Sequence, residues 1–372
     1  MQCGLFGCDL KRSRRRCRSV FAVCRADRTS PINLFLLPWR QSRAAPRWDI
    51  GIFVIMVSIA LVVLVTLLVS SRTWGSAHYS STQTLYDRPI IGVLAQETHF
   101  DNLLVYGKSY IAASYVKTLE SAGARVIPIK INLPQEEYEK LFSYINGVLF
   151  PGGGVDLQHS EYARVAKIFY NLAIKANDQG DYFPIWGTCL GFEELTVLTS
   201  GELLLTLTKT EDVALPLNVT KSAPSSKLFR NIPPYLYQSL ARKPLTANFH
   251  DWSLSVQNFT ANEKLRSFYN VLTTNTDGIV EFISTIEAFK YPFYGVQWHP
   301  EKNPFEWKKT SDIPHSSDAI HLAFYMAEFF VSEARRNSHH FLDETLENDL
   351  LMYNYNPVYT GTISGFEQIY FF

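Results

Sequence analysis

Short apolar runs alternate with segments of helical periodicity between residues 89 and 201, and this alternation limits the possible folds more than any other feature of the chain. Runs such as "GVLF" are apolar throughout, which is typical of strands buried on both faces of a sheet. Helical segments between successive strands are the usual crossovers of a parallel sheet. We expect strands at 89–95, 125–131 and 182–188, a strand that runs into a glycine loop at 146–154, and helices at 109–124, 136–145, 160–178 and 191–201. The chain is therefore predicted to have an α/β fold of three layers, with a mainly parallel central sheet flanked by helices.

The rest of the chain extends this pattern. Residues 202–287 are richer in β-type segments and loops, 293–301 predicts one more strand, and 316–336 predicts a long closing helix. The tail from residue 341 is rich in Tyr and Phe, and we expect it to pack back on the domain. Because no repeat or linker interrupts residues 89–372, they are expected to form one domain.

An arginine-rich leader and an uncharged apolar stretch come first. Residues 1–49 are predicted to be disordered, and residues 50–69 supply the roughly twenty apolar residues that a membrane-spanning helix needs. The arginines precede the apolar stretch, so the positive-inside rule leaves the leader in the cytoplasm and sends the remainder to the lumen or exterior. Residues 70–88 are expected to be a polar stalk. In this interpretation 50–69 form a signal anchor, a hydrophobic helix at the N-terminus.

A second interpretation starts the chain at Met56. From there the sequence has the apolar core and small-residue end of a secretory signal, with Gly75 and Ala77 at the −3 and −1 positions before cleavage. No positive charge precedes that core, so both interpretations stay open. Either one sends the domain into the secretory pathway, where the sequons at Asn218 and Asn258 are candidate glycosylation sites.

The composition excludes several classes of function. The chain has 372 residues, 47% of them hydrophobic, and a formal net charge of zero. Such a chain is neither disordered nor basic enough to suggest a nucleic-acid partner. No zinc-ligand spacing, P-loop or GxGxxG motif occurs in it.

Four of the five cysteines precede the apolar stretch, and Cys189 alone follows it. A secreted domain with one cysteine has no internal disulfide and depends on its hydrophobic core. The cysteine lies in "GTCLG", where an expected strand gives way to a helix between Gly187 and Gly191. This pattern is typical of a nucleophile elbow, and a helix N-terminus favours the thiolate. A buried structural cysteine is the alternative.

Two further motifs follow expected strands. Consecutive glycines in "PGGGVD" allow backbone N–H groups near Gly153 and Gly154 to form an oxyanion hole with the N–H of Leu190. In "QWHPE", His299 is a candidate base for the thiol, and Glu301 is placed to orient its ring. Ligands of parallel sheets bind at the carboxyl ends of the strands, which makes these motifs one candidate site. An ordinary turn and a structural histidine are the alternatives.

Together these motifs resemble a known family. "GxCxGxE" followed at a distance by "HPE" resembles the class I glutamine amidotransferase-like superfamily. The stretches "GVLFPGGGVDL", "GDYFPIWGTCLGFEEL", "PLTANFHDWSLSV" and "YGVQWHPEK" look like the gamma-glutamyl hydrolase family in particular. The resemblance runs from about residue 89 to the C-terminus and makes 89–372 its catalytic domain.

The resemblance implies a cysteine-dependent hydrolase that cleaves gamma-glutamyl bonds of folylpoly-gamma-glutamates through a thioester. It implies Cys189 as nucleophile, His299 as general base and acid, and Glu301 as the orienting carboxylate. It also implies a homodimer, a lysosomal or secreted glycoprotein, and no need of a metal or cofactor. Members of the family begin with a short cleaved signal, which favours Met56 as the start. A membrane then matters only if the N-terminal segment stays uncleaved.

Substrate-binding candidates also come from the resemblance. His250 and Trp252 match a segment that borders the cleft, Glu193 occupies a position where amidotransferases carry Gln, and Tyr115 is a further candidate. Ordinary core packing is the alternative for His250, Trp252 and Tyr115. A polyanionic substrate also needs cations, and the sequence does not choose among Lys108, Arg125 and Lys302.

Two other functions compete with the hydrolase. A glutaminase-type amidotransferase would pass ammonia to a synthase, but the chain has no synthase domain and carries a secretory segment. A non-catalytic, membrane-tethered binding domain on the same fold would lack the nucleophile or the histidine, and both are present. Alkylation of Cys189 below the ordinary pKa of a thiol, about 8.5, would favour an enzyme.

Overall fold

The computed structural model describes residues 85–372. The expected leader (1–49), the apolar segment (50–69) and most of the expected stalk (70–88) lie outside the described residues. Within residues 85–372, no helix is both long enough and apolar enough to cross a bilayer.

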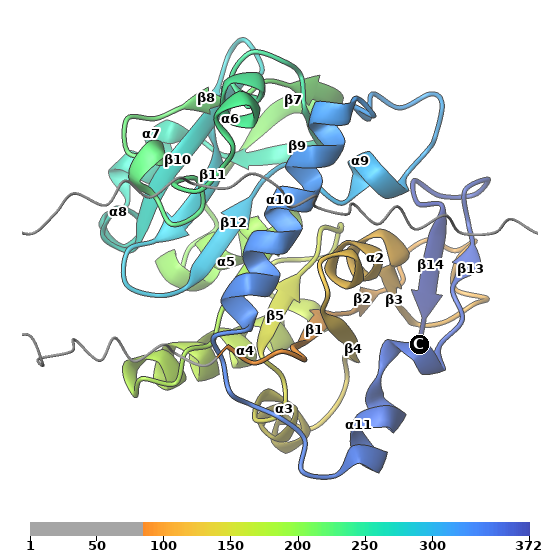
Figure 1. Cartoon of the computed structure of the whole chain (residues 1–372). Helices are drawn as coiled ribbons and strands as arrows, with labels where there is room; N and C mark the ends of the chain where they lie inside the picture. Colours follow the sequence, from red (N-terminus) through yellow and green to blue (C-terminus); the bar gives the residue numbers. More distant parts are fainter. Residues whose placement is uncertain (1–84) are drawn as a thin grey trace, which may run out of the picture. The chain divides into compact units, whose positions relative to one another are not determined.

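A sheet of eight strands forms the centre of the described domain (Figure 1). Its order is β4-β1-β5-β6-β12-β11-β10-β8, and the pairings from β4 to β12 are all parallel. The remaining pairings are antiparallel. The strands are β1 (Ile90–Leu94), β4 (Arg125–Ile129), β5 (Gly147–Phe150), β6 (Ile185–Thr188), β8 (Asn218–Val219), β10 (Tyr269–Thr276), β11 (Glu281–Ala288) and β12 (Phe293–Val296). The mainly parallel sheet predicted from the sequence is confirmed.

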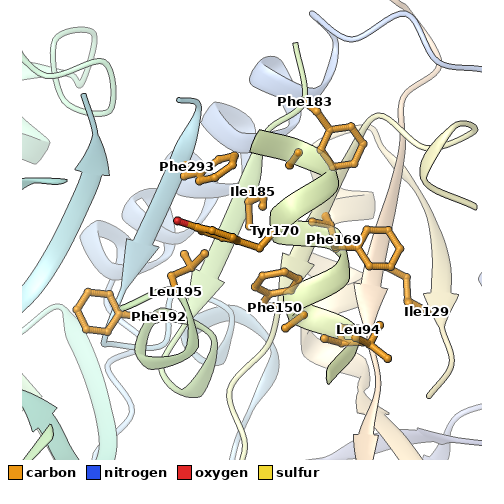
Figure 2. Packing of buried hydrophobic residues seen from close by; sticks show 14 of the residues in the cluster. Leu94, Ile129, Phe150, Phe169, Tyr170, Phe183, Ile185, Phe192, Leu195 and Phe293 are labelled. Atoms are coloured by element: carbon orange, nitrogen blue, oxygen red, sulfur yellow. The ribbon is translucent and has the colours of Figure 1, made fainter. Parts of the chain in front are cut away.

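Helices cover both faces of the sheet. Alternate residues of each strand point to opposite sides, and apolar residues on both sides are buried under these helices. From β1, Ile90 and Leu94 join the core under α3 (Gln135–Phe142) and α4 (Glu161–Asp178). Figure 2 shows aromatic and aliphatic side chains of this core packed between α4 and the strands. Ile91 and Val93 join the opposite core, which holds α2 (Ala113–Ser121) and α10 (Ser317–Ala334). The three layers expected from the sequence are therefore present.

Smaller elements surround the carboxyl ends of the parallel strands. An antiparallel ribbon joins β7 (Leu205–Leu215) to β9 (Thr246–Leu254). In the described residues, a four-stranded sheet has the order β13-β14-β3-β2, so the tail packs back on the domain as expected. Its strands are β2 (Gln96–Glu97), β3 (Ser109–Ala112), β13 (Val358–Tyr359) and β14 (Gln368–Phe371). The remaining helices are α5 (Leu190–Ser200), η1 (Ala223–Ser225), α6 (Pro234–Leu240), α7 (Val256–Ala261), α8 (Glu263–Phe268), α9 (Lys302–Phe305), α11 (Glu344–Leu350) and η2 (Met352–Asn354).

Two sequence predictions of secondary structure need correction. The helix expected at 109–124 begins only at Ala113, because its first four residues form β3 and pair with β14 of the distant tail. The strand expected at 293–301 ends at Val296. The ladder with β6 stops there, so the "QWHPE" motif leaves the sheet and can turn toward the cysteine.

Candidate active site

The candidate nucleophile occupies a strained turn between a strand and a helix. Cys189 lies between β6 and α5 with φ 51° and ψ −109°, a conformation that costs energy for a residue with a side chain. A Cβ on Gly191 would lie 1.9 Å from the carbonyl oxygen of Phe150, and one on Gly187 would lie 2.6 Å from the carbonyl carbon of Gly191. Only glycine fits at either position. The elbow expected from "GTCLG" is therefore present in the backbone.

The neighbouring strand fixes the position of this elbow. The backbone N–H of Cys189 donates to the carbonyl oxygen of Val296 at 2.8 Å, which ties the elbow to the last residue of β12. The side chain is 4% exposed, and its Sγ lies 3.8 Å from the carbonyl oxygen of Phe249 in β9. The thiol is thus nearly enclosed by two segments far apart in the sequence.

His299 and Glu301 form a buried pair directly after β12. The Nδ1 atom of His299 lies 2.6 Å from Oε1 of Glu301, and the backbone N–H of His299 donates to the carbonyl oxygen of Ala247 at 2.8 Å. A carboxylate at Nδ1 favours the tautomer in which Nδ1 carries the proton. The other ring nitrogen, Nε2, has no hydrogen-bond partner among residues 85–372. It is free to accept a proton.

The cysteine and the histidine meet beside the glycine loop after β5. A Cβ placed on Gly152 would lie 3.2 Å from Cβ of Cys189, 2.7 Å from Cε1 of His299 and 2.8 Å from the hydroxyl of Tyr115. Cys189 and His299 also line the same cavity. The structure thus brings together the three motifs that the sequence predicted to form one site.

The electrostatics of the thiol differ from the sequence expectation. Burial raises the pKa of the Cys189 thiol well above its usual value, and the charges of Glu193 and Glu301 raise this pKa further. The N–H of Leu190, at the start of α5, lowers the same pKa but does not offset burial. Burial also lowers the pKa of His299, against the influence of Glu301. The free site therefore favours a neutral thiol and a neutral imidazole, and the helix N-terminus alone does not produce a thiolate.

Of the three expected oxyanion donors, two are available. Gly153 and Gly154 line the cavities that contain Cys189, but the N–H of Gly154 already donates to Oε1 of Gln96 at 3.3 Å. The N–H of Gly153 has no hydrogen bond within residues 85–372. The N–H of Leu190 is directed toward the sulfur of Cys189. Gly153 and Leu190 are therefore better placed than Gly154 to bind an oxyanion.

Two cavities of the described domain reach Cys189 from different sides. We call the first, about 470 Å³, the lysine-side cavity, and the second, about 660 Å³, the acid-side cavity. The lysine-side cavity is lined by apolar residues together with Lys302, Lys308 and His299. The acid-side cavity is lined by Asp156, Glu193, Asp251, His250 and Trp252. Both share Gly153, Gly154, Cys189, Glu211 and Phe249.

Three of the four expected substrate-binding residues line the acid-side cavity. Burial raises the pKa of Glu193 to about 8, and its Oε1 accepts a hydrogen bond from Nε2 of Gln297 at 2.8 Å. Burial lowers the pKa of His250 to about 3, so its ring is neutral, and Nδ1 lies 2.9 Å from the Thr210 hydroxyl. Trp252 is 51% exposed and stands at the rim.

Tyr115 lies elsewhere than expected. It lines neither cavity that contains Cys189, because its ring is buried behind His299. Its hydroxyl accepts a hydrogen bond from the N–H of Gly152 at 2.8 Å and lies 3.4 Å from Nδ1 of His299. This places Tyr115 as a positioning residue for the histidine and the glycine loop, rather than as a group that contacts substrate.

The structure also distinguishes among the candidate cations. Arg125 pairs with Glu347 at the start of β4, the end of the sheet away from Cys189, and Lys108 lines neither cavity. Lys302 lines the lysine-side cavity. The sequence analysis did not single out Phe249, Lys308 or Phe366, which also line it. The only sequence signal for Phe366 was the aromatic character of the tail.

The two sequons differ in their surroundings. Asn218 is exposed in β8, whereas Nδ2 of Asn258 donates to the carbonyl oxygen of Leu204 at 2.8 Å and to the Thr206 hydroxyl at 3.2 Å. A glycan on Asn258 would have to displace these bonds. Asn218 is the more accessible acceptor in the folded domain.

Comparison with known proteins gives a consistent result. A family described as Peptidase C26 matches residues 89–301. A human protein named Gamma-glutamyl hydrolase is 62% identical over 285 residues, which cover 77% of this chain and 90% of that protein. Gamma-glutamyl hydrolase B of Dictyostelium discoideum is 42% identical over 292 residues, covering 78% of this chain and 84% of that protein.

Solved structures are more distant. The glutaminase domain of Trypanosoma brucei CTPS with bound acivicin aligns with a TM-score of 0.44 and 12% sequence identity, covering 67% of this chain and 95% of that chain. A glutamine amidotransferase from Thermotoga maritima aligns with a TM-score of 0.33 and 14% identity, covering 58% of this chain and 77% of that chain.

Proposed function

The chain belongs to the peptidase C26 family and hydrolyses gamma-glutamyl bonds, and we propose that Cys189 is the nucleophile of this reaction and that the substrate is a folylpoly-gamma-glutamate. The observation that carries the proposal is the free Nε2 atom of His299 in the same cavity as a nearly enclosed thiol. A polyglutamate substrate is supported by the relatives.

Acylation begins from the neutral pair. Nε2 of His299 takes the proton of the Cys189 thiol while Sγ attacks the gamma-carbonyl carbon, so no free thiolate has to be stabilised beforehand. The N–H groups of Gly153 and Leu190 bind the oxyanion of the tetrahedral intermediate. Glu301 holds the ring and favours its protonated form. The imidazolium then gives its proton to the departing amine as the carbon–nitrogen bond breaks, which leaves a gamma-glutamyl thioester.

Deacylation uses the same groups in reverse. His299 takes a proton from water, and the oxygen of that water attacks the thioester carbonyl. The carbon–sulfur bond breaks, and the sulfur recovers its proton from His299. The products are a carboxylic acid and the free thiol, and the free amine has left in the first half of the reaction.

The test compares two substrates on the full chain. We expect the protein to release glutamate from a gamma-linked pteroylpolyglutamate but not from its alpha-linked isomer, and a Cys189→Ala variant that melts at the same temperature to release none. Activity that survived in Cys189→Ala would exclude the thioester. Ammonia release from glutamine without cleavage of the gamma-linked substrate would instead indicate the glutaminase-type amidotransferase.

The cellular location is part of the proposal. We infer a lysosomal or secreted glycoprotein, supported by the sequons and by the apolar segment at 50–69, and a homodimer, supported by the family resemblance alone. N-terminal sequencing of the mature protein decides between a signal cleaved after Ala77 and an anchor that keeps residues 1–49.

Digestion with an N-glycosidase should reduce the mass of the wild type. In Asn218→Gln most of this loss of mass should be absent, because Asn218 is expected to carry most of the glycan. Sedimentation equilibrium checks the dimer.

A further inference from the structure

Lys302 is a buried cation beside the nucleophile. It is the first residue of α9, directly after the "HPE" motif, and it is 5% exposed. Its Nζ lies 4.6 Å from the centre of the Phe249 ring and 4.5 Å from the centre of the Phe366 ring. The two rings hold the ammonium in the lysine-side cavity with Cys189 and His299. Phe366 comes from the tail, so the end of the chain helps to position this charge.

No carboxylate within residues 85–372 forms a direct ion pair with this lysine, although its charge lowers the pKa of the Glu211 and Glu306 carboxyls nearby. The lysines and arginines that form ion pairs within residues 85–372 are Arg125, Arg164, Lys243, Lys290 and Arg336. Buried cations are normally paired, because removal from water is costly. Stacking between aromatic rings offsets only part of that cost. The lysine-side cavity therefore holds a buried ammonium with no carboxylate in direct contact within the described residues.

The two cavities differ in charge at neutral pH, even though burial raises the pKa of Glu193 to about 8 and keeps that carboxyl protonated. Four carboxyl groups and no lysine or arginine of the described residues line the acid-side cavity: Asp156, Glu193, Glu211 and Asp251. The lysine-side cavity has one carboxyl group, that of Glu211, and two lysines. Lys308, the second lysine, is exposed. A poly-gamma-glutamate keeps one free alpha-carboxylate on each residue, so this difference in charge favours the lysine side for the anionic chain.

We propose that Lys302 determines specificity by binding the alpha-carboxylate of a glutamyl residue next to the scissile bond, with Lys308 attracting the following carboxylate at the mouth of the cavity. The inference rests on the proposed function and assigns the anionic part of the substrate to the lysine side of Cys189. Phe249 and Phe366 act as positioning residues that hold the ammonium toward the substrate.

Two analogues of one short gamma-glutamyl substrate test this assignment. In each analogue, one of the two alpha-carboxylates that flank the scissile bond is replaced by a carboxamide. The wild type should cleave one analogue with a kcat/KM roughly 10- to 100-fold below that of the parent, as expected for loss of a hydrogen bond between two charged groups. Lys302→Met should lower kcat/KM on the parent by a similar factor and leave kcat/KM on that analogue nearly unchanged. The ratio of kcat/KM on the parent to kcat/KM on the analogue should therefore fall toward one. Lys302→Arg keeps a positive charge and should restore part of this preference for the parent substrate.

The chain provides a matched control. Lys130 also lies against two rings, 5.1 Å from the centre of Tyr355 and 5.7 Å from that of Phe372, and it lines neither cavity that contains Cys189. Lys130→Met should lose a comparable cation–aromatic contact and keep the wild-type preference for the carboxylate. Melting temperatures show whether both variants fold, and Lys302→Gln replaces Lys302→Met if the latter does not.

The outcomes separate the two proposals. Lys302→Met that lowers kcat/KM equally on the parent and both analogues would overturn the assignment, because Lys302 would then act only through the thiol or the fold. A wild-type protein that cleaves all three substrates at one rate would also overturn it while leaving the hydrolase intact. A wild type that cleaves none of them would overturn the proposed function itself.

Discussion

The two sides of the cleft present the same thiol to opposite environments. On the lysine side, His299 carries a carboxylate partner and a free Nε2, and the wall comes from α9 and the tail. On the acid side, the hydrogen-bond partners of His250 within the described residues are hydroxyl, amide and carbonyl groups, and burial keeps its ring neutral. One buried histidine is thus prepared to exchange protons while the other is not. The comparison shows that the partners of a histidine, more than its burial, decide what chemistry it can perform.

Substitution of the two histidines is the strongest way to break this comparison. His299→Ala removes the only ring on the thiol's proton-transfer path in the described site, and we expect kcat/KM to fall by about 10³-fold or more. His250→Ala should retain at least about ten times the activity of His299→Ala, because His250 supports the cavity wall without exchanging protons. Steady-state hydrolysis of the gamma-linked substrate measures both. Equal losses in the two variants would show that the acid side also takes part in proton transfer.

The next largest effect is expected from Gly153, in the glycine loop that lines both cavities. A Cβ on Gly153 would lie 1.8 Å from Oε1 of Gln96, so Gly153→Ala must move either Gln96 or the loop. The N–H of Gly153 would move with it, and loss of one oxyanion donor lowers kcat by about 10²-fold. Gly180→Ala is a control outside the site, and it should leave kcat unchanged while carrying strain from its φ of 85°. A Gly153→Ala variant with wild-type kcat would remove this N–H from the mechanism.

Glu301→Gln tests whether the negative charge of Glu301 contributes to catalysis through the pKa of His299. The amide can still occupy the position 2.6 Å from Nδ1 of His299, but it no longer raises the pKa of that ring. The acid limb of the kcat/KM profile reports protonation of His299, so it should move to lower pH, and kcat should fall by about tenfold. The pH profile is the decisive measurement, because a purely structural loss would lower the rate without moving the limb.

Much of this fold follows from the sequence, since each buried strand is a short apolar run and each crossover helix has a helical period. The same holds for the Cys189, His299 and Glu301 positions, because each follows a strand end where a parallel sheet binds its ligands. Other features depend on contacts distant in sequence. The strand Ser109–Ala112 pairs on one side with β14 of the tail, and the Phe366 ring that lies beside Lys302 also comes from the tail. Nor does a local motif reveal that burial opposes the thiolate, because burial is a property of the packed domain.

The last predicted effect is on stability rather than on catalysis, and it comes from two consecutive buried glutamates of α5. Burial raises the pKa of both Glu193 and Glu194 to about 8 in the folded chain, against about 4.5 for an ordinary Glu. Between these two values the unfolded chain has released protons that the folded chain still binds, so stability falls as pH rises through this range. Each group contributes up to about 1.4 kcal/mol per pH unit there. Both carboxyl oxygens of Glu194 lack partners within residues 85–372, whereas Glu193 accepts a bond from Gln297.

Urea unfolding at pH 5 and at pH 7.5 measures this contribution. The wild type should be more stable at the lower pH, and Glu193→Gln and Glu194→Gln should each reduce the difference, because a neutral amide binds no titrating proton. Lys302→Met is the control from the other side of the cleft. It should largely keep the wild-type difference in the free energy of unfolding between pH 5 and pH 7.5. If neither Glu variant reduces the difference, both carboxyls are ionised in the folded domain. Glu193 lines the acid-side cavity, which would then carry one more negative charge and strengthen the preference of an anionic substrate for the lysine side.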